Sequence, residues 1–208
     1  DKYEKVDEIP FDFARRRMSV VIKDKSGKTQ MVTKGAIEEM LSICSHTVYN
    51  GRAIELTDNI KDEVRKNAIE LNEDGMRVIG VAQKTNPRSE GLFSVEDEKN
   101  MLLMGYIGFL DPPKDSAAKA IQALHEYGVS IKVLTGDNEI VTKKICKEVG
   151  IKAEKIILGV EVEELSEVQL ENIVEETTIF AKLSPLQKSR VVKALQRRGH
   201  TVGYMGDG

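Results

Sequence analysis

The chain is poor in several residue types. Its 208 residues include no tryptophan, only 5% aromatic residues and two cysteines, Cys44 and Cys146. Two cysteines so far apart do not make the disulfide framework of a small secreted domain. Each lies in a pattern typical of a helix, so we expect two buried thiols in a reducing compartment.

Long apolar runs and a strong excess of one charge are also missing. No run approaches the roughly 20 apolar residues that a membrane-spanning helix needs, so we expect the chain by itself to be soluble. Its net charge is -3 with both signs interspersed, which gives no support to a surface for nucleic acid. With 40% hydrophobic and 31% charged residues, it can bury a core, which argues against a disordered chain.

The amino-terminal half combines hairpin and helix signals. Residues 17–33 form two β-rich runs around a polar turn, and Asn50-Gly51 is typical of a tight hairpin turn. A helix with an apolar face follows and ends at Gly75. These signals predict an α+β unit with an antiparallel sheet over residues 1–108.

The carboxyl-terminal half, residues 109–208, alternates short strands with helices. It opens near Pro112-Pro113, which can continue neither a strand ladder nor a helix, so we place the hinge between the halves there. The alternation predicts βαβ units and a partial Rossmann-like parallel sheet, which makes the fold class α/β. The predicted strands are residues 131–134, 155–158, 178–183 and 201–206, and the predicted helices are 115–127, 139–149 and two that begin after Ser166 and Ser184.

Local signals mark the ends and faces of these helices. Gln169 follows Ser166 by three residues, and Gln187 follows Ser184 by three, which is the spacing of a capping box. Helix 115–127 has an apolar stripe that we expect to be buried. The stripe consists of Ala117, Ile121 and Leu124.

Polar residues follow several predicted strands at the carboxyl edge of the parallel sheet, where open α/β folds bind ligands. Thr135, Gly136 and Asp137 follow the first strand, Lys188 lies one helical turn beyond the third, and Asp207 follows the last. A hydroxyl and an ammonium can hold phosphate oxygens, and a carboxylate can hold the Mg²⁺ that offsets charge on a transferring group. Their common placement predicts a phosphoryl-transfer site.

Each of these features also has an ordinary structural explanation. Thr-Gly-Asp is common in turns, a lysine on a helix is usually solvated, and Gly-Asp-Gly is common in loops. A helix cap needs only one residue here, and Asn138 is already placed to provide it. The hypothesis of a site therefore depends on the joint placement of these residues at one edge.

The same segments resemble a known family. Similarity to the phosphorylation domain of P-type cation-transporting ATPases, members of the haloacid dehalogenase-like superfamily, occurs in "DPPK", "TGDN", "KLSPLQK" and "GDG". Similarity to the nucleotide-binding domain of the same pumps occurs in "EIPFDFARRRMSVV", "TKGA" and "GMRVIGVA". The resemblance spans nearly the whole chain. It is greatest to the bacterial magnesium-transporting branch, with calcium pumps next.

The resemblance implies that Phe11 stacks on adenine and that Arg16 lies near the nucleotide. Phe13 competes for the stacking role, because both rings lie on one face if this segment is a strand. Phenylalanine is more often a core residue, which is the alternative for Phe11. The three arginines at 15–17 could instead form a patch for anionic ligands, although strand alternation would split them between two faces.

Three further nucleotide contacts are implied. Lys34 and Gly35 match the family's Lys-Gly-Ala, in which glycine lets the backbone approach adenine and lysine draws in the phosphates. Arg77 matches the arginine that reaches the nucleotide phosphates, and Asp111 matches the hinge aspartate. As alternatives, Arg77 is a surface arginine with its stem on the sheet, and Asp111 is simply the residue before two prolines.

Roles in phosphoryl transfer are implied for the other residues. Thr135, Gly136 and Asp137 match the family's Thr-Gly-Asp, in which Thr135 would hold an oxygen of an aspartyl phosphate and Asp137 would face the nucleotide phosphates and magnesium. Lys188 would balance the charge of the phosphorylated site, and Asp207 would bind the metal. The implied cofactors are ATP and Mg²⁺.

Parts of the family pattern do not occur in the sequence. The Asp-Lys-Thr-Gly-Thr motif that carries the phosphorylated aspartate is absent, and so are the Asn-Asp pair expected after Gly-Asp-Gly and the membrane helices. The chain also begins and ends abruptly beside strand patterns. We therefore expect a fragment from the cytoplasmic face of a membrane protein, unable by itself to form the aspartyl phosphate.

The implied function is the ATP-binding and phosphoryl-transfer region of an ATP-driven pump. Its partners would be ATP and a cation, Mg²⁺ or Ca²⁺, that crosses through a membrane domain; no nucleic acid is expected. A soluble haloacid dehalogenase-like phosphatase with an inserted cap is one alternative, opposed by the missing nucleophile and by the Lys-Gly-Ala element. A non-catalytic nucleotide-binding module is the other, and the residues that precede Asp1 in the parent protein would decide it.

Overall fold

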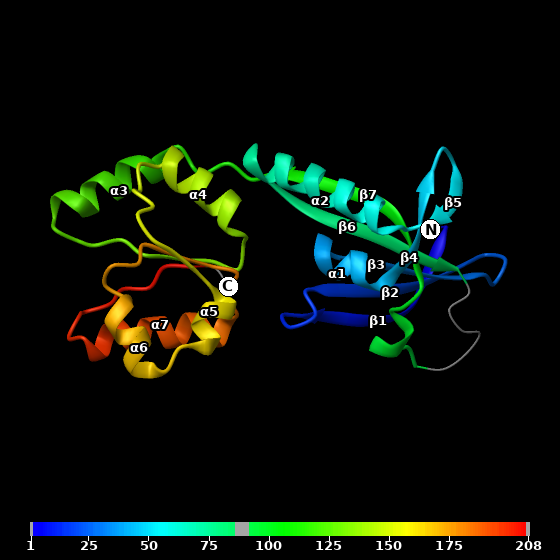
Figure 1. Cartoon of the computed structure of the whole chain (residues 1–208). Coiled ribbons are helices and arrows are strands. Elements are labelled where there is room, and N and C mark those ends of the chain that lie inside the picture. The colour runs from blue at the N-terminus through cyan, green and yellow to red at the C-terminus, as the bar shows by residue number, and fades with distance from the viewer. Residues whose placement is uncertain (1, 86–91, 207–208) are drawn as a thin grey trace. The chain divides into compact units, whose positions relative to one another are not determined.

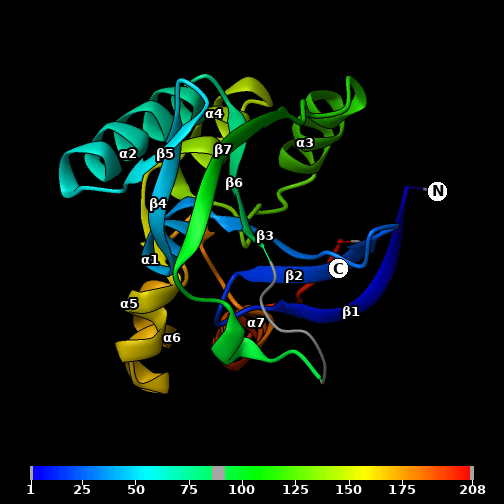
Figure 2. The same cartoon turned by 90° about the vertical axis from the view of Figure 1, so that its right-hand side faces the viewer.

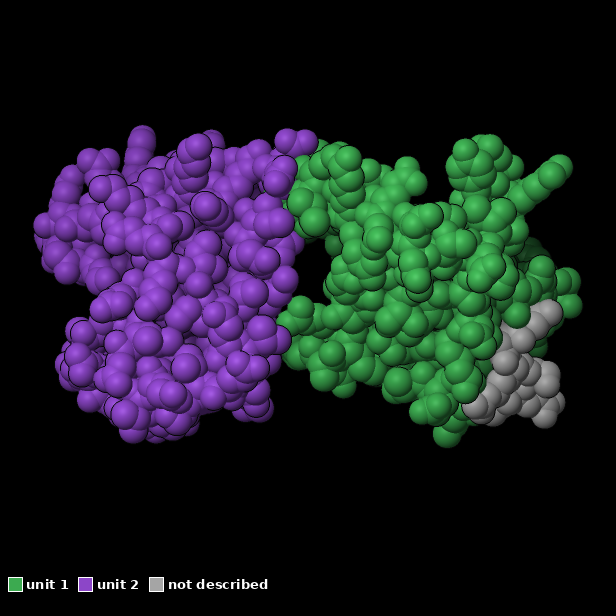
Figure 3. Space-filling model, viewed as in Figure 1, with its two compact units in different colours: residues 1–72, 76–109 green, residues 73–75, 110–208 purple. Residues whose placement is uncertain are grey.

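Residues 2–85 and 92–206 are described in the computed structural model of the chain, and they divide into two units (Figure 1). Unit 1 consists of residues 1–72 and 76–109, and unit 2 of residues 73–75 and 110–208 (Figure 3). The chain therefore passes between the units around residues 72–76 and again between Phe109 and Leu110. The assignment of residues 1–108 as a nucleotide-binding domain and of residues 109–208 as a phosphorylation domain stays a prediction.

Unit 1 is built on a seven-stranded sheet in the order β1-β2-β3-β6-β7-β4-β5, within the described residues. Figure 2 shows this sheet with β1 at one edge and β5 toward the other. The strands are β1 (Tyr3–Asp12), β2 (Arg17–Asp24), β3 (Thr29–Ala36), β4 (Cys44–Tyr49), β5 (Arg52–Glu55), β6 (Met76–Thr85) and β7 (Met101–Leu110). Three further elements complete unit 1: α1 (Ile37–Ile43), α2 (Asp58–Glu73) and the short 3-10 helix η1 (Val95–Asp97).

Both predicted hairpins are confirmed. β2 pairs antiparallel with β3, and β4 pairs antiparallel with β5. The second hairpin turns at Asn50 and Gly51, whose φ angles of 48° and 75° are those that a two-residue turn of this kind requires. The sheet is mainly antiparallel as predicted, but β4 and β7 run parallel. This pairing joins segments far apart in the chain, so local turn signals did not indicate it.

The core of unit 1 lies between the sheet and its helices. Met40 and Leu41 of α1 are fully or almost fully buried, and Ile60 and Val64 of α2 pack against the same cluster. Cys44 begins β4 and is buried as a free thiol, as expected, although not within a helix. Burial raises the pKa of its thiol to about 12. The buried members contributed by the strands are Ile9, Val21, Met31, Ala82, Met101 and Leu103.

Unit 2 is a three-stranded parallel sheet with helices on both faces (Figure 1). The strand order is β8-β10-β9 within the described residues, and the strands are β8 (Val133–Leu134), β9 (Ile156–Leu158) and β10 (Ile179–Ala181). The helices are α3 (Ser116–Glu126), α4 (Glu139–Glu148), α5 (Gly159–Glu164), α6 (Glu167–Ile173) and α7 (Pro185–Arg197). This arrangement confirms the predicted α/β class and its Rossmann-like part.

The central strand β10 is covered on both faces. Ile179 and Ala181 belong to the cluster that includes Cys146 of α4, whereas Phe180 belongs to the cluster with α5, α6 and α7. All three side chains are fully buried. A strand covered on both faces reads as a continuous apolar run, which is why "TIFAKL" predicted it.

The helix-capping signals in unit 2 are confirmed. The Ser166 side chain accepts from the Gln169 backbone N–H while the Gln169 side chain accepts from the Ser166 N–H, and Ser184 and Gln187 do the same at α7. Pro185 occupies the first turn of α7, where its missing N–H costs nothing.

Two predictions for unit 2 are wrong. Residues 201–206 contain no strand, and Tyr204 and Met205 are exposed. An alternating sequence favours an extended backbone, but a strand also needs a neighbour to bond with, and this segment pairs with none of β8–β10. Leu124 is 41% exposed, because the core that α3 contacts includes Ala117 and Ile121 but does not reach its last turn.

Within residues 2–85 and 92–206, no helix has the length and apolar character that crossing a lipid bilayer requires. Cys146 is the second buried free thiol, as expected.

Candidate functional site

Two exposed aromatic rings lie at the end of β1. Phe11 is 52% exposed and Phe13, in the turn that follows, is 59% exposed. Their ring centroids are 5.2 Å apart and their planes are nearly perpendicular, at 85°. The alternative in which Phe11 is a core residue is therefore wrong. Either ring offers a face to a planar ligand, so the choice between them stays open.

The turn that carries Phe13 is closed by Asp12. One carboxylate oxygen of Asp12 accepts from the backbone N–H of Ala14 at 2.6 Å and of Arg15 at 3.1 Å. These two hydrogen bonds hold the pKa of the Asp12 carboxyl below its ordinary value. The backbone N–H of Arg16 donates to the Asp12 carbonyl at 2.7 Å, and Arg16 takes a positive φ of 47°. Asp12 thus contributes both its carboxylate and its carbonyl to the local hydrogen bonds of the turn.

Gly35 lies against this turn at very short range. It pairs with Arg17 across β2 and β3, and a Cβ at residue 35 would lie 2.5 Å from the Arg17 Cβ and 2.6 Å from the Arg16 carbonyl oxygen. The next residue, Ala36, donates its N–H to that same carbonyl at 3.1 Å. Glycine is therefore required here by contacts inside the protein, independently of the predicted approach to adenine, which stays a prediction.

The strand register places Lys34 and Arg77 on one face of the sheet. Lys34 pairs with Met18 on β2 and with Val81 on β6, and Arg77 lies four residues before Val81 on the same strand. Because side chains alternate along a strand, Lys34, Val81 and Arg77 share the face opposite Thr33. Both cationic side chains are exposed. Unit 1 therefore combines an exposed aromatic pair with an arginine-bearing turn next to Gly35, and two cations on one sheet face.

In unit 2, the loop after β8 is joined to the end of β10 by backbone hydrogen bonds. The Thr135 N–H donates to the Phe180 carbonyl at 3.0 Å, and the Leu183 N–H donates to the Thr135 carbonyl at 2.9 Å. The Lys182 N–H donates to the Asp137 carbonyl at 2.8 Å. These bonds fix the Thr-Gly-Asp segment at the carboxyl edge of the sheet, as predicted.

Thr135 and Asp137 also bond to each other. The Thr135 hydroxyl donates to the Asp137 carboxylate at 3.1 Å and accepts from the Asp137 backbone N–H at 3.1 Å. The cap of α4 is supplied by Asn138, whose side-chain oxygen accepts from the Val141 N–H at 2.9 Å. Thr135 and Asp137 are therefore not needed as helix caps, although their mutual hydrogen bonds are also those of a local turn.

Lys182 is a residue at this edge that the sequence did not single out. Strand β10 ends at Ala181, and Lys182 takes a positive φ of 54°, an unusual backbone conformation for a lysine. Its ammonium lies 3.1 Å from the Glu139 carboxylate at the start of α4. The run "TIFAKL" suggested that the strand continues through this residue, so the pattern concealed the bend.

The remaining predicted residues are Lys188, Asp111 and Asp207. Lys188 is half-buried in the first turn of α7, which begins two residues after Leu183. Asp111 is exposed and lines a small cavity of unit 2 with Pro112, Pro113 and Lys144. Asp207 lies outside the described residues. The described part of the chain contains no group of three or more histidine, cysteine, aspartate or glutamate side chains that could hold a metal ion. The functional roles of all these residues stay predictions.

Two protein-family models match the chain, and together they cover its whole length. A family model described as the cytoplasmic domain N of P-type ATPases matches residues 1–116, and one of haloacid dehalogenase-like hydrolases matches residues 82–208. The chain is 45% identical to the magnesium-transporting ATPase, P-type 1, of Escherichia coli K12, with 100% of the chain and 23% of that protein covered. A protein of the same name from Salmonella typhimurium LT2 is 46% identical, with the same coverage.

A calcium-transporting ATPase of Bacillus subtilis is 33% identical, with 99% of the chain and 23% of that protein covered. The chain thus spans about a quarter of the length of these relatives. The matches confirm the resemblance carried by the sequence motifs. The chain belongs to the P-type ATPase family and carries its domain N followed by haloacid dehalogenase-like sequence.

Proposed function

We propose that this chain is the ATP-binding and phosphoryl-transfer region of an ATP-driven pump for Mg²⁺. The observation that carries the proposal is the match of the whole chain to magnesium-transporting ATPases, at higher identity than to the calcium-transporting ones. Calcium is the second candidate for the transported ion.

Unit 1 would bind the nucleotide. An exposed pair of rings suits adenine, because a base can stack on a solvent-facing aromatic ring without a buried polar partner. Lys34 and Arg77 would attract the phosphates from the sheet face that they share. Arg16 adds a third cation at the turn.

Unit 2 would act on the phosphoryl group. The Thr135 hydroxyl, which donates to Asp137 in the ligand-free chain, would turn its single hydrogen to a phosphate oxygen, while the Lys188 ammonium would offset the negative charge that accumulates there. Carboxylate and hydroxyl oxygens are ligands that Mg²⁺ prefers, so the Asp137 carboxylate and the Thr135 hydroxyl are donors that suit that ion. The resemblance to the family adds Asp207, which lies outside the described residues, as a further residue that would hold it. Bound there, the ion would neutralise charge on the transferring group.

The aspartate that accepts the phosphoryl group would come from the rest of the parent protein. The decisive experiment uses that parent in membranes, incubated with radiolabelled ATP and quenched in acid. Acid-stable label that hydroxylamine removes is expected, since an aspartyl phosphate has this reactivity. Nucleotide binding without any label would favour a non-catalytic module, and hydrolysis of simple phosphate esters by this chain alone would favour a soluble phosphatase.

A further inference from the structure

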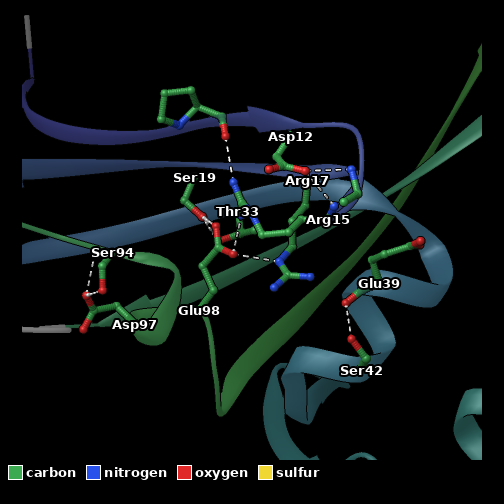
Figure 4. Close-up of polar contacts among 12 residues, drawn as sticks. Asp12, Arg15, Arg17, Ser19, Thr33, Glu39, Ser42, Ser94, Asp97 and Glu98 are labelled. Atoms are coloured by element: carbon green, nitrogen blue, oxygen red, sulfur yellow. Dashed lines mark hydrogen bonds and ion pairs between the residues drawn. The ribbon is translucent and has the colours of Figure 1, made fainter. Parts of the chain in front are cut away.

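A buried carboxylate lies beneath the turn between β1 and β2 (Figure 4). Glu98 directly follows η1, and its side chain is fully buried. One of its oxygens accepts from the Arg15 guanidinium and from the Arg17 guanidinium, each at 2.7 Å. The other oxygen accepts from the Ser19 hydroxyl at 2.7 Å. Glu98 is therefore bonded to three side chains of one short segment that precedes it by about eighty residues.

Burial makes this arrangement demanding. A carboxylate removed from water is tolerated only when charged or polar partners satisfy it, and removing one member leaves the others buried and unpaired. The Ser19 hydroxyl continues the network to Thr33 on β3, at 2.7 Å. Glu98 thus links η1 to the turn and to two strands of the sheet (Figure 4).

The bonds reach both ends of the segment that carries the candidate nucleotide residues. Arg17 begins β2, and Arg15 lies within the turn. Arg15 also donates to the Pro10 carbonyl at 2.8 Å, so it connects Glu98 to the residue immediately before Phe11. Phe11 and Phe13 therefore lie within a segment whose two sides are fixed to a single carboxylate.

Arg16 lies between the two anchored arginines. Its positive φ is unfavourable for a residue with a side chain, and such a conformation persists only where the surroundings enforce it. The bonds of Arg15 and Arg17 to Glu98 supply that enforcement from both sides. Two of the three consecutive arginines, Arg15 and Arg17, are thereby paired with Glu98, and Arg16 stays the predicted contact for the nucleotide.

We infer that Glu98 is a positioning residue of the nucleotide site. It does not contact the nucleotide; it holds residues 10–17 in the shape that presents the Phe11 and Phe13 rings and Arg16 to ATP. The inference rests on the proposed function of unit 1. Because Glu98 orders the turn before ATP binds, less conformational entropy is lost on binding, and the affinity for ATP is higher.

The test compares Glu98→Gln with Glu167→Gln in the 208-residue chain. Glu167 is a matched control, because it too accepts from two arginines, Arg190 and Arg197, but lies in unit 2. Affinity for a fluorescent ATP analogue is measured well below the melting temperature of each variant, with near-UV circular dichroism to show that it is folded. Glu98→Gln is expected to weaken binding about fivefold or more, and Glu167→Gln to leave it unchanged.

A double-mutant cycle separates positioning from general damage. If Glu98 acts through the rings, Glu98→Gln adds no further loss in a chain that already carries Phe11→Ala and Phe13→Ala. Full additivity would overturn the inference. Should Glu98→Gln prove unfolded, Arg15→Lys replaces it: it keeps a cation beside Glu98 but cannot also reach the Pro10 carbonyl, and the same non-additive loss is expected.

The outcomes distinguish the inference from the function on which it rests. A wild-type chain that fails to bind the analogue would overturn the proposed role of unit 1 together with that of Glu98. Wild-type affinity retained in a folded Glu98→Gln variant would overturn the positioning role alone.

Discussion

The backbone N–H of Lys182 donates a 2.8 Å hydrogen bond to the carbonyl oxygen of Asp137. This bond joins the bend after β10 to the loop after β8, so the Thr135 and Asp137 side chains are presented by main-chain contacts that their replacement leaves intact. Because Asn138 caps α4 independently, replacing Thr135 or Asp137 removes only the hydrogen bonds between these two residues and leaves the helix cap in place.

Phosphoenzyme formation should depend on this edge. In the full-length parent, Thr135→Ala, Asp137→Asn and Lys188→Ala are each expected to cut acid-stable labelling from ATP by roughly tenfold or more, the scale for losing a group that stabilises transferring charge. Thermal unfolding of the 208-residue chain should shift little. The control is Asn138→Ala, which should lower stability by about 1 kcal/mol and retain labelling. Normal labelling with a large loss of stability in the first three variants would reduce Thr-Gly-Asp to a structural turn.

The adenine contact can be assigned by replacing each exposed ring. Phe11→Ala or Phe13→Ala should weaken binding of a fluorescent ATP analogue by about 1–3 kcal/mol, the range for one lost base-stacking contact. The family motif favours Phe11. Tyr49→Ala is the control, because Tyr49 is another exposed aromatic residue of unit 1, at the end of β4. Unchanged affinity in both phenylalanine variants would move the adenine site elsewhere.

Gly35→Ala should destabilise unit 1. The added methyl group would meet the Arg17 backbone and the Arg16 carbonyl, neither of which can move without disturbing the β2–β3 ladder, so we expect a loss of about 1–3 kcal/mol. Gly51→Ala is a useful comparison, because no atom lies near that position and the cost should come only from its positive φ. Urea unfolding followed by circular dichroism measures both. If the urea midpoint of Gly35→Ala equals that of the wild type, β2 and β3 can move apart enough to accept the methyl group, which would contradict this prediction.

Acid should weaken unit 2 through Glu175. Hydrogen bonds from Arg198 and His200 lower the pKa of the Glu175 carboxyl to about 2. Because the folded-state pKa lies below the unfolded value, the carboxylate stabilises the fold above about pH 4.5, and this contribution is lost as the pH falls toward 2. Melting temperatures of the wild type and of Glu175→Gln should therefore differ at pH 7 and converge through that range. A difference that is independent of pH would contradict this origin.

The features that the sequence predicted are those encoded within a few residues. The capping boxes at Ser166 and Ser184 and the Asn50-Gly51 turn are local patterns, and each forms as expected. The Thr-Gly-Asp loop was found because an apolar run ends immediately before it and a helical pattern begins immediately after it.

The features that the sequence did not predict depend on distant segments. The carboxylate of Glu98 meets Arg15 and Arg17 from far along the chain, and nothing near residue 98 signals that contact. The expected strand at residues 201–206 failed for the same reason, because alternation describes one segment and pairing requires two. Lys182 was missed because a strand pattern does not show at which residue the backbone leaves the extended conformation for a positive φ.

The central position of β10, paired along both edges, has a consequence for how unit 2 folds. Its central strand pairs with β9, which precedes it by a short stretch of chain, and with β8, which precedes it by about twice that length. Closing the longer loop costs more chain entropy before any contact is rewarded, so the β9–β10 pair, with α5 and α6 between them, should form first. Strand β8, which Thr135 and Asp137 follow, would then be added last. The candidate phosphoryl-transfer residues would therefore be the latest part of the unit 2 sheet to become ordered.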